Sequence, residues 1–257
     1  MRRLAALLLL ALAVALAACG SDDDNASSAE KPVLTVSAAA SLTEALTALK
    51  SDYGAAQLRF SFAGSDELAA QIRKGVKPDV FAAANTKLPE ALAKEGLVEK
   101  PVVFATNDLV LAVPAQGSKV SSLDGLAKPG LKLAIGAKSV PVGEYTREVL
   151  SGLPAGEKKA ILANVRSEEP DVKGVVGKVS QGAADAGFVY RSDVDAAGGK
   201  LEAITLPKKL APRVAYGVAV VKGAKQPEAA RAFVQSLLKG QGALALRDAQ
   251  IGPPPSS

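Results

Sequence analysis

The stretch LTVSAAASLTEALTALKSDY, residues 34–53, decides the fold, because it passes directly from a strand pattern to a helix pattern. Leu34–Ser37 has the short, apolar and β-branched composition of a buried strand. Ser41-Leu42-Thr43-Glu44 has the S-x-x-E spacing of a capping box, which predicts Ser41 as the N-cap of the helix that follows. That helix would bury one apolar face, made of Ala45, Leu46, Leu49 and Tyr53.

The chain repeats this alternation of strand and helix patterns from Pro32 onward. Such alternation is typical of βαβ units around largely parallel sheets, so we predict the α/β fold class. The further strands that we predict are Leu58–Phe62, Val80–Ala83, Leu109–Val113, Leu131–Ile135, Ala186–Tyr190, Leu201–Thr205 and Ala215–Val221.

Three further helix starts follow predicted strands or loops. Ser65 precedes Asp66 and Glu67 as Ser41 precedes its own helix, and the other starts lie at Pro141 and at Pro170-Asp171-Val172. Each start presents unpaired backbone N–H groups, which is how an α/β protein binds an anion at the carboxyl edge of its sheet. The alternative for any one of them is an ordinary capped helix. The helix that opens at Pro227 and ends before Gly240 has a regular apolar face and is predicted to be core scaffolding.

Composition excludes several classes of function. With 48% apolar and 22% charged residues, the 257-residue chain can bury a core and is not of disordered type. It has no His, which excludes Ser-His-Asp and Cys-His machinery and imidazole metal sites. One Cys excludes an internal disulfide and multi-Cys metal centres, and the absence of Trp argues against stacking surfaces for bases or sugars. A binding protein, or an enzyme that uses unusual groups, remains.

The net charge of +5 does not indicate a nucleic-acid partner. Lys and Arg are scattered in ones and twos, so we expect a mixed, solvated surface.

The N-terminal residues read as an export signal. Arg2-Arg3 precedes fifteen Ala, Leu and Val residues, Leu4 to Ala18, a run too short to span a bilayer comfortably. Leu16-Ala17-Ala18-Cys19 resembles a bacterial lipobox, which implies a signal peptide at 1–18 and a lipid on Cys19. The alternative is an uncleaved anchor. Residues 19–30 lack large apolar side chains and are predicted to be a flexible tether, which would leave an extracytoplasmic, membrane-anchored lipoprotein.

Five segments resemble, in the same order, the motifs of periplasmic molybdate-binding proteins of ABC uptake systems. Together they run through nearly all of residues 33–251. The segments are VSAAASLT at 36–43, FAGS at 62–65 with PDVF at 78–81, VPVGEY at 140–145, DVKG at 171–174, and DAGFVY at 185–190 with Ser192-Asp193.

The resemblance implies a type II periplasmic binding protein that closes two lobes on a tetrahedral oxyanion. Each lobe would hold a mixed, mostly parallel sheet flanked by helices. The implied limits are 31–109 with 215–251 for one lobe, 110–214 for the other, and 252–257 for a C-terminal tail, expected to be frayed because of its three prolines.

The resemblance also implies which residues bind the oxyanion. Ser41 and Ser65 would each offer a hydroxyl and a backbone N–H, Val142 and Val172 their backbone N–H groups, and Tyr190 its phenol. The ligand would be molybdate or tungstate, delivered by a monomer to an ABC permease. No catalysis, no cofactor and no metal ion coordinated directly by the protein are expected.

Some positions depart from the family pattern and bear on specificity. Val142 replaces a frequent Ala, Gly64 a frequent Ser, and Ala83-Ala84-Asn85 the usual S-A-D. Asp66 would supply an acceptor for the proton of hydrogen phosphate if it faced the pocket, whereas the simpler alternative is that it faces solvent.

Three other functions stay open from the sequence. A receptor for sulfate or phosphate would use the same fold. A surface hydrolase would use Ser41 or Ser65 with a Lys base, although neither serine lies in a G-x-S-x-G or S-x-x-K motif. A scaffold or adhesin lipoprotein would bind no small anion.

Overall fold

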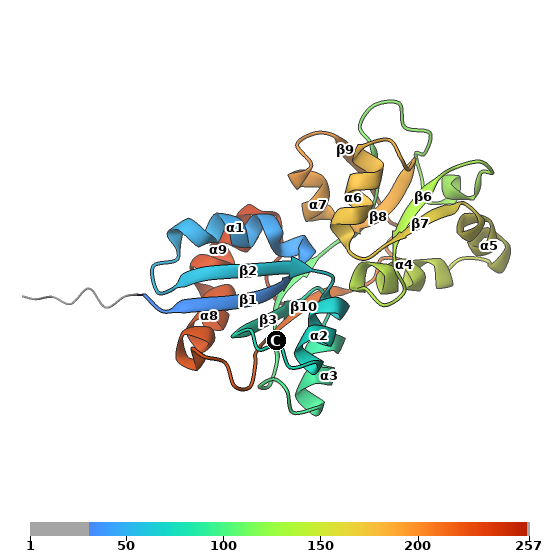
Figure 1. Ribbon diagram of the computed structural model, residues 1–257. Helices are drawn as coiled ribbons and strands as arrows, with labels where there is room; N and C mark the ends of the chain where they lie inside the picture. Colours follow the sequence, from blue (N-terminus) through green and yellow to red (C-terminus); the bar gives the residue numbers. More distant parts are fainter. Residues whose placement is uncertain (1–30, 256–257) are drawn as a thin grey trace, which may run out of the picture. The chain divides into compact units, whose positions relative to one another are not determined.

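The computed structural model describes residues 31–255. The predicted signal peptide (1–18), the lipidation site Cys19 and the tether (19–30) lie outside the described residues. Between residues 31 and 255 no helix is long and apolar enough to cross a membrane. The described chain forms two five-stranded sheets, each flanked by helices (Figure 1). We call each sheet with its helices a lobe.

The first sheet has the strand order β2-β1-β3-β10-β4. β1 pairs in parallel with β2 and β3, and β10 pairs antiparallel with β3 and β4, so β10 alone runs against the other four strands. The bounds are β1 Val33–Ala39, β2 Gln57–Ala63, β3 Val80–Ala83, β4 Val102–Asn107 and β10 Val214–Val220.

The second sheet repeats this plan with the order β7-β6-β8-β5-β9. Here β5 alone runs against the other four strands. Both sheets are therefore mixed and mostly parallel, as predicted. The bounds are β5 Leu109–Pro114, β6 Leu133–Gly136, β7 Val165–Glu169, β8 Ala186–Tyr190 and β9 Leu201–Thr205.

Helices cover both sheets (Figure 1). The first lobe contains η1 Ala40–Leu42, α1 Thr43–Asp52, α2 Ser65–Arg73, α3 Lys87–Lys94, α8 Pro227–Lys239 and α9 Gln241–Asp248. The second contains η2 Asp124–Ala127, α4 Pro141–Ser151, α5 Ala155–Ala163, α6 Val172–Ser180 and α7 Arg191–Ala196.

The centre of the first sheet is buried on both faces, and β3 shows how. Val80 and Ala82 belong to the large hydrophobic core, whereas Phe81 and Ala83 belong to a second cluster with Leu68 and Ile72 of α2. All four strand residues are fully buried. Continuous apolar composition is what a strand covered by helices on both faces requires.

The carboxyl ends of six parallel strands lead into the segments that carry the predicted site residues. In the first lobe β1, β2 and β3 end at Ala39, Ala63 and Ala83. In the second lobe β6, β7 and β8 end at Gly136, Glu169 and Tyr190. Helix N-termini follow these ends, which is where α/β sheets bind ligands.

The chain passes between the sheets twice. β4 ends at Asn107 and β5 begins at Leu109, and β9 ends at Thr205 and β10 begins at Val214. The first strand after each change of sheet begins at Leu109 and at Val214. The division of the chain into two lobes at the predicted limits stays a prediction. Gly252, predicted as the start of a frayed tail, instead pairs with the backbone of Thr106, whose hydroxyl donates to Pro253 O at 2.8 Å.

The eight strands predicted from the sequence are all present, and three of them have the predicted bounds. β4 and β7 were not predicted. Both are edge strands, and β7, with the sequence VRSEE, alternates between half-buried and exposed residues. Its pairing with β6, rather than its composition, makes it a strand.

The prediction that Ser41 and Ser65 are N-caps is wrong. A turn of 3-10 helix, Ala40–Leu42, precedes α1, so Leu42 occupies the N-cap position and Ser41 lies one residue before it. Gly64 is the N-cap of α2, and Ser65 is its first residue. Both serine hydroxyls are instead used in long-range hydrogen bonds. The helix starts at Pro141, Val172 and Pro227 are as predicted.

Candidate functional site

A cavity of about 20 Å³ lies where the strand ends of the two lobes meet. Its walls contain all five residues that the sequence singled out, although they come from four helix starts and one strand end. These residues are Ser41, Ser65, Val142, Val172 and Tyr190. Alanines at 39, 40, 63 and 84 form much of the remaining wall, and their small side chains let backbone reach the space.

The size of the cavity limits what can occupy it. Pockets for drug-sized ligands measure roughly 300–1,000 Å³, so a sugar, peptide or nucleotide does not fit here. The space suits one small ion or a water molecule.

Ser41 and Ser65 are buried, and each hydroxyl oxygen already accepts a hydrogen bond from another part of the first lobe. Tyr216 donates its O–H to Ser41 Oγ at 3.0 Å, and the backbone N–H of Ala84 donates to Ser65 Oγ at 3.1 Å. A hydroxyl has one hydrogen, so each serine retains that hydrogen for a partner inside the cavity.

Val142 and Val172 contribute through position rather than through their side chains. They are the second residue of α4 and the first of α6, where helical geometry leaves N–H groups unpaired. The first hydrogen bond of the α4 ladder comes later, from Glu144 N to Val140 O at 2.9 Å. The positive ends of both helices therefore face the cavity.

The side chain of Val142 packs against Gly136. Its Cγ1 lies 2.6 Å from the point where a Cβ on Gly136 would stand. A valine is accommodated at this helix start because residue 136 has no side chain.

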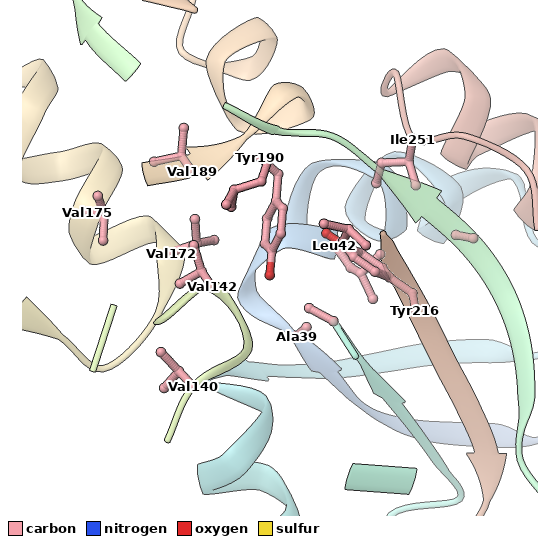
Figure 2. Packing of buried hydrophobic residues seen from close by; sticks show 14 of the residues in the cluster. Ala39, Leu42, Val140, Val142, Val172, Val175, Val189, Tyr190, Tyr216 and Ile251 are labelled. Carbon is pink, nitrogen blue, oxygen red and sulfur yellow. The ribbon is translucent and has the colours of Figure 1, made fainter. Parts of the chain in front are cut away.

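Tyr190 is fully buried, and its hydroxyl oxygen has no hydrogen-bond partner in the described chain. Burial raises the pKa of Tyr190 well above its usual value, so the group stays a phenol. Figure 2 shows its ring between the valines Val142 and Val172 on one side and Leu42 and Tyr216 on the other. A buried hydroxyl without a partner is costly, and a ligand oxygen in the cavity would satisfy it.

No Lys or Arg lines the cavity. Its one charged residue is Asp171, whose carboxylate accepts from Gly174 N at 2.9 Å as the N-cap of α6. The nearest residue in sequence with a positive charge, Lys173, pairs with Glu44 and Asp193 instead. The cavity thus offers neutral hydrogen-bond donors from both lobes and no cation.

A second, wider cleft of about 620 Å³ lies between α1, α7 and α9 and shares Ser41 with the small cavity. Four carboxylates line it, from Glu44, Asp52, Asp195 and Asp248, and no Lys or Arg does. This cleft is larger, but its charge would repel an anion, so the small cavity is the better anion site.

The structure shows why residue 64 is Gly rather than the frequent Ser, and whether Asp66 faces the cavity. A Cβ on Gly64 would overlap the carbonyl oxygen of Pro170 in the second lobe, so a serine there does not fit this arrangement. Asp66 is half-buried and does not line the cavity, and its Oδ1 is enclosed without a hydrogen-bond partner in the described chain. Asp66 therefore neither reaches the ligand space nor points freely into solvent.

Sequence reasoning missed the residues that support the site from behind, namely Asn107, Tyr216 and Lys173. Tyr216 lies in a predicted strand, and the one available signal was its hydroxyl, because a buried tyrosine normally finds a hydrogen-bond partner. Nothing in the sequence indicated that this partner would be Ser41.

The chain is similar to known proteins in sequence and in structure. The family model described as bacterial extracellular solute-binding protein matches residues 34–249. The molybdate-binding protein ModA of Mycobacterium tuberculosis is 37% identical over 242 residues, which cover 90% of each chain.

Two solved structures are similar. The substrate-binding domain of a putative molybdenum ABC transporter from Clostridium difficile is 31% identical with a TM-score of 0.66, covering 87% of this chain and 99% of that one. The periplasmic molybdate-binding protein of Azotobacter vinelandii has a TM-score of 0.77, covering 86% of this chain and 100% of that one. At 22% identity the second likeness shows the fold alone.

Proposed function

This chain belongs to the bacterial extracellular solute-binding proteins, and on that premise we propose that it captures molybdate between its two lobes and delivers it to an ABC permease. We extend the proposal to tungstate, an oxyanion of the same shape and charge. The observation that carries it is the convergence of Ser41, Ser65, Val142, Val172 and Tyr190 on one small cavity without a cation.

Neutral donors suit a dianion if they are numerous and rigidly held. An anion that leaves water loses its hydration, and hydrogen bonds to a charged group must replace it. Helix N-termini add partial positive charge that does not depend on a mobile side chain. Donors fixed in this way can be spaced for one ionic radius.

Size then selects among oxyanions. A smaller anion such as sulfate would not reach every donor at once, and each buried donor left unpaired costs about 1–3 kcal/mol. Two or three lost contacts are enough for strong discrimination.

Closure of the lobes follows from where the donors stand. Ser41 and Ser65 belong to the first lobe and the other three to the second, so the full set assembles only when the lobes meet. Release to the permease would reverse this hinge motion. We propose that the protein acts as a monomer, anchored outside the cytoplasmic membrane by a lipid on Cys19.

We also propose that the chain is not an enzyme. The hydroxyl oxygens of Ser41 and Ser65 accept hydrogen bonds from Tyr216 and Ala84, and no Lys that could serve as their base lines the small cavity. The chain has no His to act as that base.

Isothermal titration of the ligand-free protein with molybdate, tungstate, sulfate and phosphate tests the proposal. We expect tight binding of molybdate and tungstate and weak binding of the other two. Equal affinity for sulfate would overturn the specificity. A melting temperature that no oxyanion raises would favour a scaffold protein, because a ligand at a hundredfold excess over its Kd stabilises by about 2.7 kcal/mol.

A further inference from the structure

Three buried polar side chains form a line behind the oxyanion cavity. Asn107 is the last residue of β4, Tyr216 lies in the neighbouring strand β10, and Ser41 stands at the cavity wall. Asn107 Nδ2 lies 3.4 Å from the Tyr216 hydroxyl, which lies 3.0 Å from Ser41 Oγ. Tyr216 does not line the cavity itself.

The direction of these hydrogen bonds is set at the Asn107 end. The backbone N–H of Asp108, which can only donate, donates to Asn107 Oδ1 at 2.9 Å. The amide nitrogen of Asn107 therefore faces the other way, toward Ser192 Oγ at 2.8 Å and the Tyr216 hydroxyl. An amide nitrogen cannot accept, so the Tyr216 oxygen is the acceptor.

Tyr216 must then give its own hydrogen elsewhere, and Ser41 Oγ is its acceptor. Burial raises the pKa of Tyr216, so its hydroxyl keeps that hydrogen at any physiological pH. Because Ser41 accepts from Tyr216, its own hydrogen remains free to donate to a ligand in the cavity that Ser41 lines.

We propose that Asn107 and Tyr216 are positioning residues that hold Ser41 as a hydrogen-bond donor toward the cavity, so that the site rejects oxyanions that carry a proton. The proposal rests on the oxyanion function above. A protonated anion needs an acceptor for its hydrogen, and Ser41, with one lone pair already taken by Tyr216, meets the cavity as a donor of its own hydrogen. Ser65, held by Ala84 N–H, has the same constraint. We call the hydrogen-bonded line from Asn107 through Tyr216 to Ser41 the relay. The size of the cavity selects among fully ionised anions, and the relay selects against anions that carry a proton.

Two variants test the relay. Tyr216→Phe removes the hydrogen given to Ser41 and keeps the ring that packs against Tyr190 and Phe104. Asn107→Asp replaces the donor that faces Tyr216 with an acceptor, which turns the Tyr216 hydrogen away from Ser41. Tyr53→Phe is the matched control, because it removes a buried tyrosine hydroxyl of the same lobe that packs on Phe233, away from the cavity.

The readout is the ratio of the affinities for molybdate and phosphate in weakly alkaline buffer. Phosphate is then a dianion with one proton, so the charge added by Asn107→Asp repels both ions equally and leaves the ratio unchanged. Molybdate affinity is measured by titration calorimetry, and phosphate affinity by its displacement of molybdate. We expect the ratio to fall by about tenfold or more in both variants and to stay at its wild-type value in Tyr53→Phe.

If Tyr216→Phe or Asn107→Asp melts as a folded protein and its molybdate-to-phosphate affinity ratio lies within about twofold of wild type, the relay is wrong. The proposed function would still stand. If the wild-type protein binds another fully ionised oxyanion instead of molybdate, the proposed function is wrong. The relay is then tested by titrating the same variants with that oxyanion in place of molybdate. A wild type that binds no oxyanion overturns both.

Discussion

Lys173 of the second lobe and Glu44 of the first form an ion pair, with 2.7 Å between the ammonium nitrogen and the carboxylate. Lys173 also pairs with Asp193 of its own lobe at 2.9 Å. Burial opposes the charge on Lys173, but the two carboxylates outweigh it and raise the pKa of the ammonium group. The pair joins α1 to α6 next to the cavity and holds the lobes in the arrangement that completes the site.

The first prediction concerns this pair. Glu44→Gln removes this attraction between the lobes. Oxyanion affinity should fall by up to about fivefold, since partly exposed pairs contribute only about 0.2–1 kcal/mol. Calorimetry at low and high salt checks this, and the wild-type advantage should shrink at high salt. Glu95→Gln, which breaks the similarly exposed Arg73–Glu95 pair within one lobe, should leave affinity unchanged. Equal losses of oxyanion affinity in Glu44→Gln and Glu95→Gln would contradict the role of the Lys173–Glu44 pair in holding the lobes together.

The second prediction concerns the serine donors. Ser41→Ala and Ser65→Ala should each weaken molybdate binding by about 1–3 kcal/mol, because each leaves one ligand oxygen without its hydrogen bond. Calorimetry measures the loss, and circular dichroism shows whether the fold is retained. Ser236→Ala serves as a control, because its hydroxyl donates to Phe233 O within α8, away from the cavity. Unchanged affinity in both site variants would show that the donors are misassigned.

The third prediction separates binding from stability at Tyr190. Tyr190→Phe should weaken oxyanion binding by about 1–3 kcal/mol. Without ligand the variant should melt at or above the wild-type temperature, because the hydroxyl that it removes is buried without a partner. Thermal unfolding with and without molybdate measures both effects. A ligand-free protein that is clearly destabilised would mean that this hydroxyl has a partner in solution.

The fourth prediction concerns the close approach at Gly64. Gly64→Ala places a Cβ against the carbonyl of Pro170, so the lobes should not reach the arrangement described here. Overpacking of this kind costs about 1–3 kcal/mol, and affinity should fall by about tenfold while the ligand-free melting temperature stays near that of wild type. Gly54→Ala is the matched control, since a Cβ there meets nothing within 4 Å. If Gly64→Ala binds the oxyanion with wild-type affinity, residue 64 and the carbonyl oxygen of Pro170 lie farther apart in solution than in this structure.

The fifth prediction concerns pH. Burial raises the pKa of Asp193 to about 6, although Lys173 and the Tyr190 amide act in the opposite direction. An unfolded aspartic acid has a pKa of about 3.9, so between these values the folded protein binds the proton more tightly than the unfolded chain. The stability due to this group is therefore fully present below about pH 4 and is lost as the pH rises through about 6.

Asp193→Asn removes this titration. Relative to the variant, the wild type should lose about 3 kcal/mol of unfolding free energy as the pH rises from 4 to above 6. Denaturant unfolding at several pH values measures it. A difference that is constant across this range would show that Asp193 stays ionised in its pair with Lys173.

Much of the fold and the site could be predicted because the signals are local. The alternation of apolar runs with helical periods defines the α/β class, and continuous burial explains why the limits of β3 and β8 agree with the predicted strands. The prolines at 141 and 227 mark helix starts because they can occupy only the first turn. The motifs placed five donors on segments that the structure brings to one cavity.

The tertiary structure alone decided what those residues contact. Ser41 reads locally as a helix cap, but its hydroxyl accepts from Tyr216, 175 positions later. β7 is a strand because β6 lies beside it, and Glu44 is an ion-pair partner because Lys173 lies opposite. Periodicity and capping depend on neighbours within a turn or two of the chain, whereas hydrogen bonds and ion pairs between distant segments depend on how the sheets bring those segments together.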